Sequence, residues 1–407
     1  MVSSTIKSLL DLDLYKLTQQ QFFWKNFPNL KVKYQFINRS DIDLSKVLTK
    51  TILEEEFNNI KSLSFTQSEL SYLETLGLFE KDFLNYLKNY KLPDLTITED
   101  LKIHTNSNNY CKDAILWETI VLSTINQLYY KHKYPNPELI SEKINGLTML
   151  RYSMRGLSNA KIKGLVTDFG TRRRFSHEWH DTVCSYISKH ESFSGTSNVY
   201  FAKKYGMTPI GTNAHELYMI AAGVFDKGTD ESLRNSQNTI IDKWYDMYGY
   251  ESSIALSDTF GTDFFFEDFK TQAPTWKGIR HDSGDAVEFG ESVIQYYKSL
   301  NIDPKTKMLI FSDGLDIPKI IELYNKFNGR IKISFGWGTK LTNNVGYETL
   351  SIVMKAVEVI SNDDIPINNS LVKLSDNLNK HMGTDKDITR YKKAFNYKNT
   401  NSETLIV

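Results

Sequence analysis

The chain has 407 residues, of which 40% are hydrophobic and 13% are aromatic, and its formal net charge is zero. A chain of this length can form two domains, or one barrel with a sizeable additional domain. The balanced charge argues against a nucleic acid or a membrane surface as the main partner, and two cysteines are too few for a disulfide framework.

The N-terminal residues do not have the pattern of a signal peptide, because MVSSTIKSLLDLDLYK lacks a long apolar core and carries acidic residues early. No window of the sequence approaches the roughly 20 apolar residues of a membrane helix. We therefore expect a soluble intracellular protein, located in the cytoplasm, with a nuclear location left open.

Residues 1–130 predict a mixed α+β domain. A helix is expected after Asp13, and residues 31–37 alternate like a half-buried strand. Two amphipathic helices are expected between residues 66 and 90, then a hairpin at 95–104 and a long apolar helix at 113–130. Part of residues 376–407 is expected to join this domain.

Beyond residue 150, strand-like and helical segments alternate. Strands followed by helices are expected at 165–169, 193–197, 208–212, 253–258 and 278–280. Strands at 308–311 and 330–335 flank a helix that starts near residue 315, and apolar β-branched runs follow at 352–359 and 371–374. A series of roughly seven or more such units predicts a closed or nearly closed parallel β/α barrel over residues 131–375.

The loops after these strands are expected on one rim, where parallel α/β proteins bind ligands. They collect arginines, carboxylates, hydroxyls and glycines: DFGTRRR (168–174), GTSN (195–198), GTNAHE (211–216), SDT (257–259), RHDSGD (280–285), SDG (312–314) and GWGT (336–339). Glycine loops and arginines bind phosphate, and carboxylates suit ribose hydroxyls or a divalent metal ion. The rim therefore predicts a sugar-phosphate site rather than one for acyl transfer.

His215 and the Arg172–Arg174 run each have two interpretations. His215 opens a helix after GTNA, where a histidine either has a capping or core role or attacks a phosphoryl group as a nucleophile. The three arginines can be a solvated helical turn, but three cations at a helix start oppose the helix dipole unless an anion binds there. The residues alone leave both questions open.

Two pairs of side chains are better explained by structural roles when taken singly. His177 and His180 have the spacing of metal ligands on a helix, but no third ligand is evident, and we favour no metal there. Tyr15 and Phe169 are aromatic, and a single aromatic side chain is more often part of the core than of a site.

A series of motifs resembles the nicotinate phosphoribosyltransferase family, in that family's order and over nearly the whole chain. The motifs are SLLDLDLYKLTQQQ (8–21), TDFGTRRRFS (167–176), GTSN (195–198), GTNAHE (211–216), LSDTFGTD (256–263), GIRHDSGD (278–285), FSDGLD (311–316), SFGWGT (334–339) and VKLSDN (372–377). Any one of them is weak, but the ordered series is specific. The resemblance implies a type II phosphoribosyltransferase fold, which is an irregular α/β barrel with an N-terminal domain, and a homodimer with its sites near the interface.

The resemblance also implies a reaction. The family makes nicotinate mononucleotide and pyrophosphate from nicotinate and phosphoribosyl pyrophosphate, the first step of salvage toward NAD. ATP hydrolysis is coupled to this reaction through a phosphorylated histidine, and we expect Mg²⁺ to offset the charge of the leaving pyrophosphate. No general base is expected, because the attacking pyridine nitrogen carries no proton.

Site residues carry over by their place in the motifs. His215, as the phosphohistidine, is the implied catalytic residue together with Arg280 and Asp282, which match the motif that holds the phosphoribosyl group. In the related nicotinamide enzyme two aromatic residues sandwich the pyridine ring, and they match Phe169 and Tyr15, the latter expected from the partner subunit. The other implied substrate contacts are Arg172, Ser197, Asp313 for the ribose hydroxyls, and Gly336, Gly338 and Thr339 for the 5′-phosphate. The metal ligands stay open.

Ser197 favours nicotinate as the substrate. The nicotinamide enzyme has an aspartate at this place, and a carboxylate there would repel nicotinate, whereas Ser197 with Arg172 suits an anion. Trp337 is bulkier than expected in its loop, and its side chain is expected to point away from the ligand.

Several alternatives remain beside this interpretation. Nicotinamide or quinolinate is the substrate in enzymes of the same fold, and a catalytically silent sensor would bind nicotinate or a nucleotide without turnover. The intact His215, Arg280, Asp282 and Asp313 argue against a sensor. A barrel glycosidase would use rim carboxylates, but it leaves the glycine loops and arginines without a role.

Overall fold

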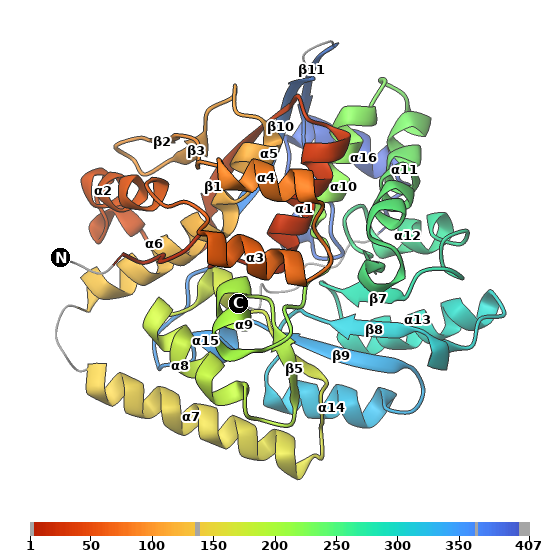
Figure 1. Ribbon diagram of the computed structural model, residues 1–407. Helices are drawn as coiled ribbons and strands as arrows, with labels where there is room; N and C mark the ends of the chain where they lie inside the picture. The colour runs from red at the N-terminus through yellow and green to blue at the C-terminus, as the bar shows by residue number, and fades with distance from the viewer. Residues whose placement is uncertain (1–3, 135–138, 363–364, 399–407) are drawn as a thin grey trace. The chain divides into compact units, whose positions relative to one another are not determined.

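The computed structural model describes residues 4–134, 139–362 and 365–398 (Figure 1). The chain forms two compact units, which we call unit 1 and unit 2. Unit 1 comprises Met1–Gly211 and Trp337–Lys355, and unit 2 comprises Thr212–Gly336 and Ala356–Ile406. The predicted domains, 1–130 and 131–375, divide the chain elsewhere and stay a prediction.

The N-terminal part of unit 1 combines helices with a small antiparallel sheet. Strand β1 (Leu30–Asn38) pairs with β3 (Ile103–Thr105), which pairs with β2 (Leu95–Ile97). The helices are α1 (Leu14–Asn26), α2 (Lys50–Lys61), α3 (Gln67–Thr75), α4 (Lys81–Lys88), α5 (Cys111–Ala114) and α6 (Trp117–Lys133). A capping box of Thr66 and Glu69 starts α3. The predicted hairpin and the helices after Asp13 and within 66–90 are confirmed, whereas α2 was not predicted.

The rest of unit 1 contains a parallel strand pair and the helices that follow it. Strand β4 (Val166–Asp168) pairs with β5 (Phe193–Thr196), and the helices are α7 (Leu139–Asn159), α8 (His177–Ile187), α9 (Val199–Tyr205) and α15 (Thr339–Thr342). The predicted helix from residue 172 is wrong at its start. Thr171–Arg173 is a separate 3-10 turn, and α8 begins only after Ser176, whose side chain caps it by accepting from Trp179 N.

The core of unit 2 is a parallel sheet. Its strands β6 (Ile254–Leu256), β7 (Gly278–His281), β8 (Met308–Phe311) and β9 (Lys332–Trp337) are neighbours in that order. The helices are α10 (His215–Phe225), α11 (Asp230–Tyr248), α12 (Thr262–Asp268), α13 (Ala286–Ser299), α14 (Ile317–Phe327) and α16 (Asp385–Ala394). Helix α13 packs on β7 and β8, and α11 packs beside α16 (Figure 1). Gly278 is required here, because a Cβ atom would lie 2.0 Å from the carbonyl oxygen of Met308.

The α/β fold class is confirmed, but a closed barrel is not. The described parallel strands are β4 and β5 in unit 1 and β6–β9 in unit 2, and no pairing among the described residues closes them into a ring. Three segments counted toward the barrel do not contribute a parallel strand. Residues 208–212 form only a bridge at Pro209, which lacks the N–H that a longer ladder needs. Residues 371–374 form only a bridge at Lys373, and β10 (Ile352–Asn362) pairs antiparallel with β11 (Ile365–Ser370).

Both cysteines are buried free thiols, Cys111 beside the hydroxyl of Tyr34 and Cys184 beside Asp168. Within the described part of the chain, no helix is both long and apolar enough to cross a membrane. As the sequence predicted, no disulfide stabilises the described part of the chain.

Asp268 joins α12 to α11 and predicts a pH dependence of stability. Its carboxylate accepts hydrogen bonds from Gln237 (2.8 Å) and Asn238 (2.7 Å). Burial raises the pKa of Asp268 to about 6, although these two donors oppose the shift. The folded protein therefore keeps a proton on Asp268 that the unfolded chain releases near pH 3.8. The stability that this group contributes is present at low pH and is lost as the pH rises through about 6.

We expect the free energy of unfolding to fall by roughly 1 kcal/mol between pH 5 and pH 8 because of this one group, discounted for its partial exposure. Urea denaturation of the native protein and of Asp268→Asn across this range isolates the effect as the difference between the two curves. Asp246→Asn, an exposed position on α11, is the matched control. Parallel curves for the native protein and Asp268→Asn would contradict the prediction.

Candidate active site

The predicted site residues lie in both units. Unit 2 holds His215, Arg280, Asp282, Asp313 and Gly336, and unit 1 holds Tyr15, Phe169, Arg172, Ser197, Gly338 and Thr339. In each unit these residues lie at or near the carboxyl ends of parallel strands or at the starts of helices. Each group is organised by buried charges that hydrogen-bond to one another.

His215 is the first residue of α10 and is buried among acidic and hydroxyl groups. Its Nε2 lies 2.9 Å from an oxygen of Asp282 and 3.6 Å from Asp258 Oδ1, and its Nδ1 lies 3.1 Å from the hydroxyl of Thr259. Burial and the charge of Lys373 lower the pKa of His215 to about 4, although Asp258 and Asp282 oppose this shift. We therefore assign a neutral imidazole that donates from Nε2 to Asp282 and keeps its lone pair on Nδ1.

Asp258 is a fully buried carboxylate that faces His215. The hydroxyls of Ser283 (2.7 Å) and Ser375 (3.0 Å) donate to its Oδ2, and the ammonium group of Lys373 lies 3.6 Å away. Burial raises the pKa of Asp258, but Lys373 and His215 outweigh it and hold the pKa well below its usual range. Its other oxygen, Oδ1, is buried and has no hydrogen-bond partner among the described residues. An ionised oxygen without a donor suits a cation.

Arg280 and Asp282 lie at the end of β7. Arg280 Nη1 donates to the hydroxyl of Thr212 (2.9 Å) and to the carbonyl oxygen of Asn213 (3.0 Å), so it holds the loop that leads to His215. Its Nη2 lies 3.7 Å from Asp282, whose Oδ1 also accepts from Ser312 (3.0 Å). Burial raises the pKa of Asp282, but Arg280 and the hydrogen bond from His215 bring it well below its usual range. Asp282 therefore stays ionised between a cation and an imidazole.

Asp313 follows β8 and forms an ion pair with Lys380 at 2.8 Å. The same ammonium group donates to the carbonyl oxygen of Asp282 at 3.1 Å, so Lys380 links two of the predicted site residues. Gly336 was predicted in a loop, but it lies within β9, which continues to the buried Trp337. The glycine loop of this motif is therefore shorter than predicted and begins at Gly338.

In unit 1 three cations converge on one buried carboxylate. Arg172 Nη1 lies 3.5 Å from Glu118, the ammonium group of Lys355 lies 3.1 Å from the same oxygen, and Lys16 forms an ion pair with the other oxygen. Burial raises the pKa of Glu118, but Lys16 and Lys355 outweigh it and hold the pKa well below its usual range. The Arg172 side chain is 40% exposed, so it can still reach a ligand.

The preference for nicotinate was based on Ser197 having no carboxyl group beside it. In the structure a carboxyl group does lie beside Ser197. Its hydroxyl donates to Asp13 at 2.7 Å, and Arg172 Nε lies 3.9 Å from the same carboxyl group. Burial raises the pKa of Asp13, although Arg172 opposes the shift. A raised pKa means that Asp13 carries its negative charge less readily than an exposed aspartate, so the preference for an anion now depends on Asp13 as well as on Ser197.

The remaining predicted residues of unit 1 lie near this cluster in the fold. Tyr15 is in the first turn of α1 with its hydroxyl 3.5 Å from Glu118. Phe169 follows β4, and its amide donates to the carbonyl oxygen of Trp337 at 2.9 Å. A Cβ atom on Gly338 would lie 3.4 Å from the carbonyl oxygen of Phe169, and Thr339 starts α15. The Phe169 loop and the Gly338 loop are therefore neighbours within unit 1.

A second buried network was not predicted. Arg174 forms two hydrogen bonds with Asp11 (2.6 and 2.8 Å), and His177 (2.9 Å) and Asn198 (2.8 Å) bond the same carboxylate. Arg174 is completely buried, so it does not belong to a solvated helical turn. His177 bonds Asp11 and therefore has a structural role, as favoured from the sequence. Asp11 lies 163 residues before Arg174, and nothing in a single sequence indicates that pairing.

The network around His215 was predicted only in part. Asp258 and Thr259 were placed on the rim without a role, and Lys373 and Ser375 lie in the VKLSDN motif, to which no site residue was assigned. The VKLSDN motif was the signal that could have indicated these residues. It brings the ammonium group of Lys373 and the hydroxyl of Ser375 to Asp258, although Ser375 lies 117 residues further along the chain.

Comparison with known proteins places these residues in a family. Residues 165–399 match the nicotinate phosphoribosyltransferase (NAPRTase) family, and residues 10–126 match the NAPRTase N-terminal domain. The nicotinate phosphoribosyltransferase of Ralstonia nicotianae is 38% identical over 368 residues, which cover 86% of this chain and 90% of that protein. The enzyme of the same name from Methanococcoides burtonii is 37% identical over 403 residues, with 95% and 96% covered. The crystal structure of nicotinate phosphoribosyltransferase from Vibrio cholerae superposes with a TM-score of 0.87 at 30% identity, covering 98% of this chain and 95% of that one.

Proposed function

This chain belongs to the nicotinate phosphoribosyltransferase family, and on that basis we propose that it makes nicotinate mononucleotide and pyrophosphate from nicotinate and phosphoribosyl pyrophosphate. The observation that carries the proposal is the similarity to enzymes of that name over almost the full length of both chains. In the reaction, the pyridine nitrogen forms a bond to the anomeric carbon of the ribose while the bond from that carbon to pyrophosphate breaks. This reaction is the first step from nicotinate toward NAD.

Nicotinate is assigned to residues of unit 1. The ring stacks on the aromatic side chain of Phe169 and on that of Tyr15, the latter expected from the partner subunit, and the carboxylate pairs with the exposed guanidinium of Arg172. Ser197 donates to Asp13 at 2.7 Å and Arg172 lies 3.9 Å from the same carboxyl group, so the charge of Asp13 is offset beside this anion.

The phosphoribosyl group is assigned to residues that offer charge and backbone amides. Arg280 and Asp282 bind the pyrophosphate end and the ribose. Asp313 accepts hydrogen bonds from the ribose hydroxyls when Lys380, its ion-pair partner, also interacts with the substrate. The backbone amides of Gly338 and Thr339, which follow β9, are assigned to the 5′-phosphate, whereas Gly336 lies within the strand that precedes them. Such fixed charges stabilise the cationic, oxocarbenium-like transition state of the ribosyl group, because they do not have to reorganise as pyrophosphate departs.

His215 is assigned as the site of transient phosphorylation by ATP. Its Nδ1 keeps the lone pair, because Nε2 donates to Asp282, so Nδ1 attacks the γ-phosphorus and the bond from phosphorus to ADP breaks. Asp258 and Asp282 then stabilise the proton on Nε2. Hydrolysis of the phosphohistidine lowers the affinity for products, so ATP energy enters as a change in binding.

The residues around His215 also fit Mg²⁺. Asp258 and Asp282 each have an oxygen within 4.8 Å of His215 and of one another, and Asp258 Oδ1 has no donor among the described residues. Carboxylate oxygens are the ligands that Mg²⁺ prefers, so these two residues would hold it. When bound, Mg²⁺ supplies positive charge that offsets the phosphate oxygens.

A homodimer and a cytoplasmic location stay predictions. Sedimentation measurements on the purified protein test the first, and the mass of two chains of 47.1 kDa is the expected result. Nothing in the similar proteins favours a location in the nucleus.

The function is tested by measuring product formation from nicotinate, nicotinamide and quinolinate, each with phosphoribosyl pyrophosphate and Mg²⁺ and with or without ATP. We expect nicotinate mononucleotide from nicotinate, faster with ATP, and little product from the other two bases. Turnover of nicotinamide in preference to nicotinate would overturn the role of Arg172. Binding of nicotinate without turnover would instead support a sensor.

A further inference from the structure

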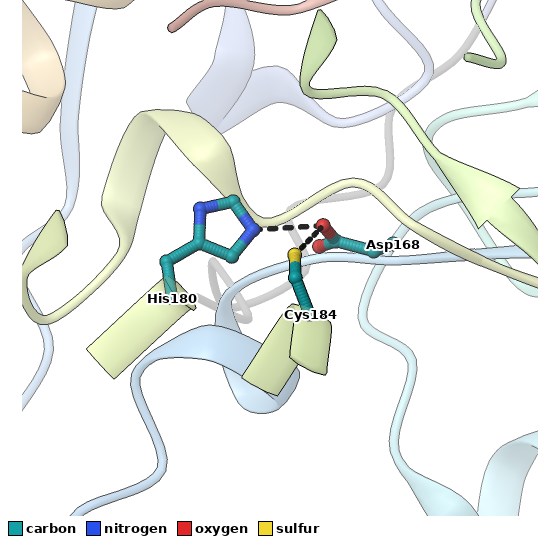
Figure 2. A group of neighbouring side chains, drawn as sticks. All are labelled: Asp168, His180 and Cys184. Carbon is teal, nitrogen blue, oxygen red and sulfur yellow. Dashed lines mark hydrogen bonds and ion pairs between the residues drawn. The ribbon is translucent and has the colours of Figure 1, made fainter. Parts of the chain in front are cut away.

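Asp168, the last residue of β4, is the centre of a buried hydrogen-bond network in unit 1 that the proposed mechanism does not use. Its Oδ2 accepts from His180 Nε2 at 2.7 Å and from the hydroxyl of Thr196 at 2.6 Å, and the thiol of Cys184 lies 3.6 Å away (Figure 2). All four side chains are buried. His180 and Cys184 come from one face of α8, and Figure 2 shows both pointing at the carboxylate.

The network joins the backbone segments that carry the residues assigned to nicotinate. Asp168 Oδ1 accepts from the amide of Gly170 at 2.8 Å, which fixes the turn that contains Phe169 and leads to Arg172. The carbonyl oxygen of Asp168 accepts from the amide of Ser197 at 2.7 Å. The carboxylate therefore holds the Gly170 turn directly, and through the hydroxyl of Thr196 it also holds the segment that carries Ser197.

A metal ion is not the best explanation of this cluster, although its donor atoms lie close together. The Oδ2 atom of Asp168 is already taken up by His180 Nε2, by the hydroxyl of Thr196 and by the thiol of Cys184, so the cluster satisfies itself by hydrogen bonds. His180 Nδ1 is buried and has no hydrogen-bond partner among the described residues, so a second proton on the ring would be unsatisfied. His180 therefore acts as a hydrogen-bond donor from Nε2 and not as a metal ligand.

We propose that His180 is a positioning residue for nicotinate, because it holds the Asp168 carboxylate, which fixes the Phe169–Arg172 segment through Gly170 and the Ser197 segment through Thr196. This inference rests on the proposed function of those residues. The imidazole is rigid and fully buried, so its loss lets the carboxylate rotate and releases the amide of Gly170. Arg280 and Asp313, which are assigned to the phosphoribosyl group, make none of the hydrogen bonds of this network.

His180→Leu and His180→Gln separate the hydrogen bond from the packing. Leucine fills the space but cannot donate, whereas the amide nitrogen of glutamine can reach the place of Nε2. For His180→Leu we expect the KM and the equilibrium Kd for nicotinate to rise by about tenfold to a hundredfold, the effect of losing a hydrogen bond to a charged group. The KM for phosphoribosyl pyrophosphate is expected to stay within about twofold, and His180→Gln to restore most of the nicotinate affinity.

Two further variants make the result decisive. Val183→Ala removes a fully buried side chain of the same helix without touching Asp168, and it is expected to lower stability but not nicotinate affinity. Thr196→Val removes the other strong donor to Asp168 and is expected to weaken nicotinate binding as His180→Leu does, so it carries the test if His180→Leu does not fold.

The proposal is overturned if His180→Leu binds nicotinate like the native protein, if Val183→Ala weakens nicotinate binding as much as His180→Leu, or if glutamine does not restore it. A native protein that fails to bind nicotinate at all would overturn the proposed function instead, and isothermal titration of the native protein with nicotinate distinguishes the two failures.

Discussion

Replacing His215 with alanine is expected to abolish the stimulation of nicotinate mononucleotide synthesis by ATP, so that the ratio of rates with and without ATP falls to about one. The reason is that His215 is the proposed phosphoryl acceptor, buried beside Asp258 and Asp282, and its Nδ1 carries the lone pair, which accepts from the hydroxyl of Thr259 at 3.1 Å until a phosphoryl group takes that place. Transfer of labelled phosphate from ATP to the protein, stopped in alkali to preserve phosphohistidine, is expected in the native protein and to be absent in His215→Ala. The ATP-independent reaction is expected to continue, because nicotinate attack needs no proton transfer.

The matched control is His381→Ala, which removes a partly buried histidine of the same unit whose ring contacts Tyr397. This variant is expected to be phosphorylated like the native protein. Labelled phosphate on His215→Ala would show that another residue accepts it, and ATP stimulation without any phosphoenzyme would show that ATP acts by binding alone. Either result contradicts the assignment.

Local segments were predictable where the sequence pattern and the local physics agree. Strand β8, helix α14 and strand β9 were predicted because an apolar run, apolar residues at helical spacing with Pro318 near the helix start, and a second apolar run occur in order. The sequence could not show that the barrel does not close. The apolar runs in β10 and at 371–374 have the same composition as barrel strands and differ only in the strands they pair with.

For the site as well, the sequence predicted which residues take part but not which residues they pair with. Most predicted residues occupy loops that follow the strands, because the motifs carry their own turns. The partners of those residues could not be predicted: Ser197 bonds Asp13 across a separation of 184 residues, and Lys380 pairs with Asp313 across 67. These pairings change the electrostatic argument, since the residue beside Ser197 is a buried acid with a raised pKa rather than an absence of charge. Long-range contacts of this kind decide a substrate preference that a motif can only suggest.

Replacing Arg172 with glutamine is expected to lower kcat/KM for nicotinate by about a hundredfold or more, while nicotinamide turnover, however slow, changes much less. The guanidinium is the proposed partner of the nicotinate carboxylate, and nicotinamide has no charge there to lose. Arg172→Lys is expected to fall in between, because lysine keeps the charge but not the paired donors. Steady-state kinetics with both bases give the ratio directly.

Arg173→Gln is the matched control, since it removes a neighbouring charge in the same turn while the backbone contacts that Arg173 makes with Asn126 and Asn343 are kept. It is expected to leave the ratio of the two bases unchanged. The glutamine at position 172 can still donate to Glu118, so it tests the charge more than the packing. If nicotinate and nicotinamide lose activity equally in Arg172→Gln, then Arg172 acts by offsetting the charges of Glu118 and Asp13, and the discrimination between the bases must come from Ser197 and its hydrogen bond to Asp13.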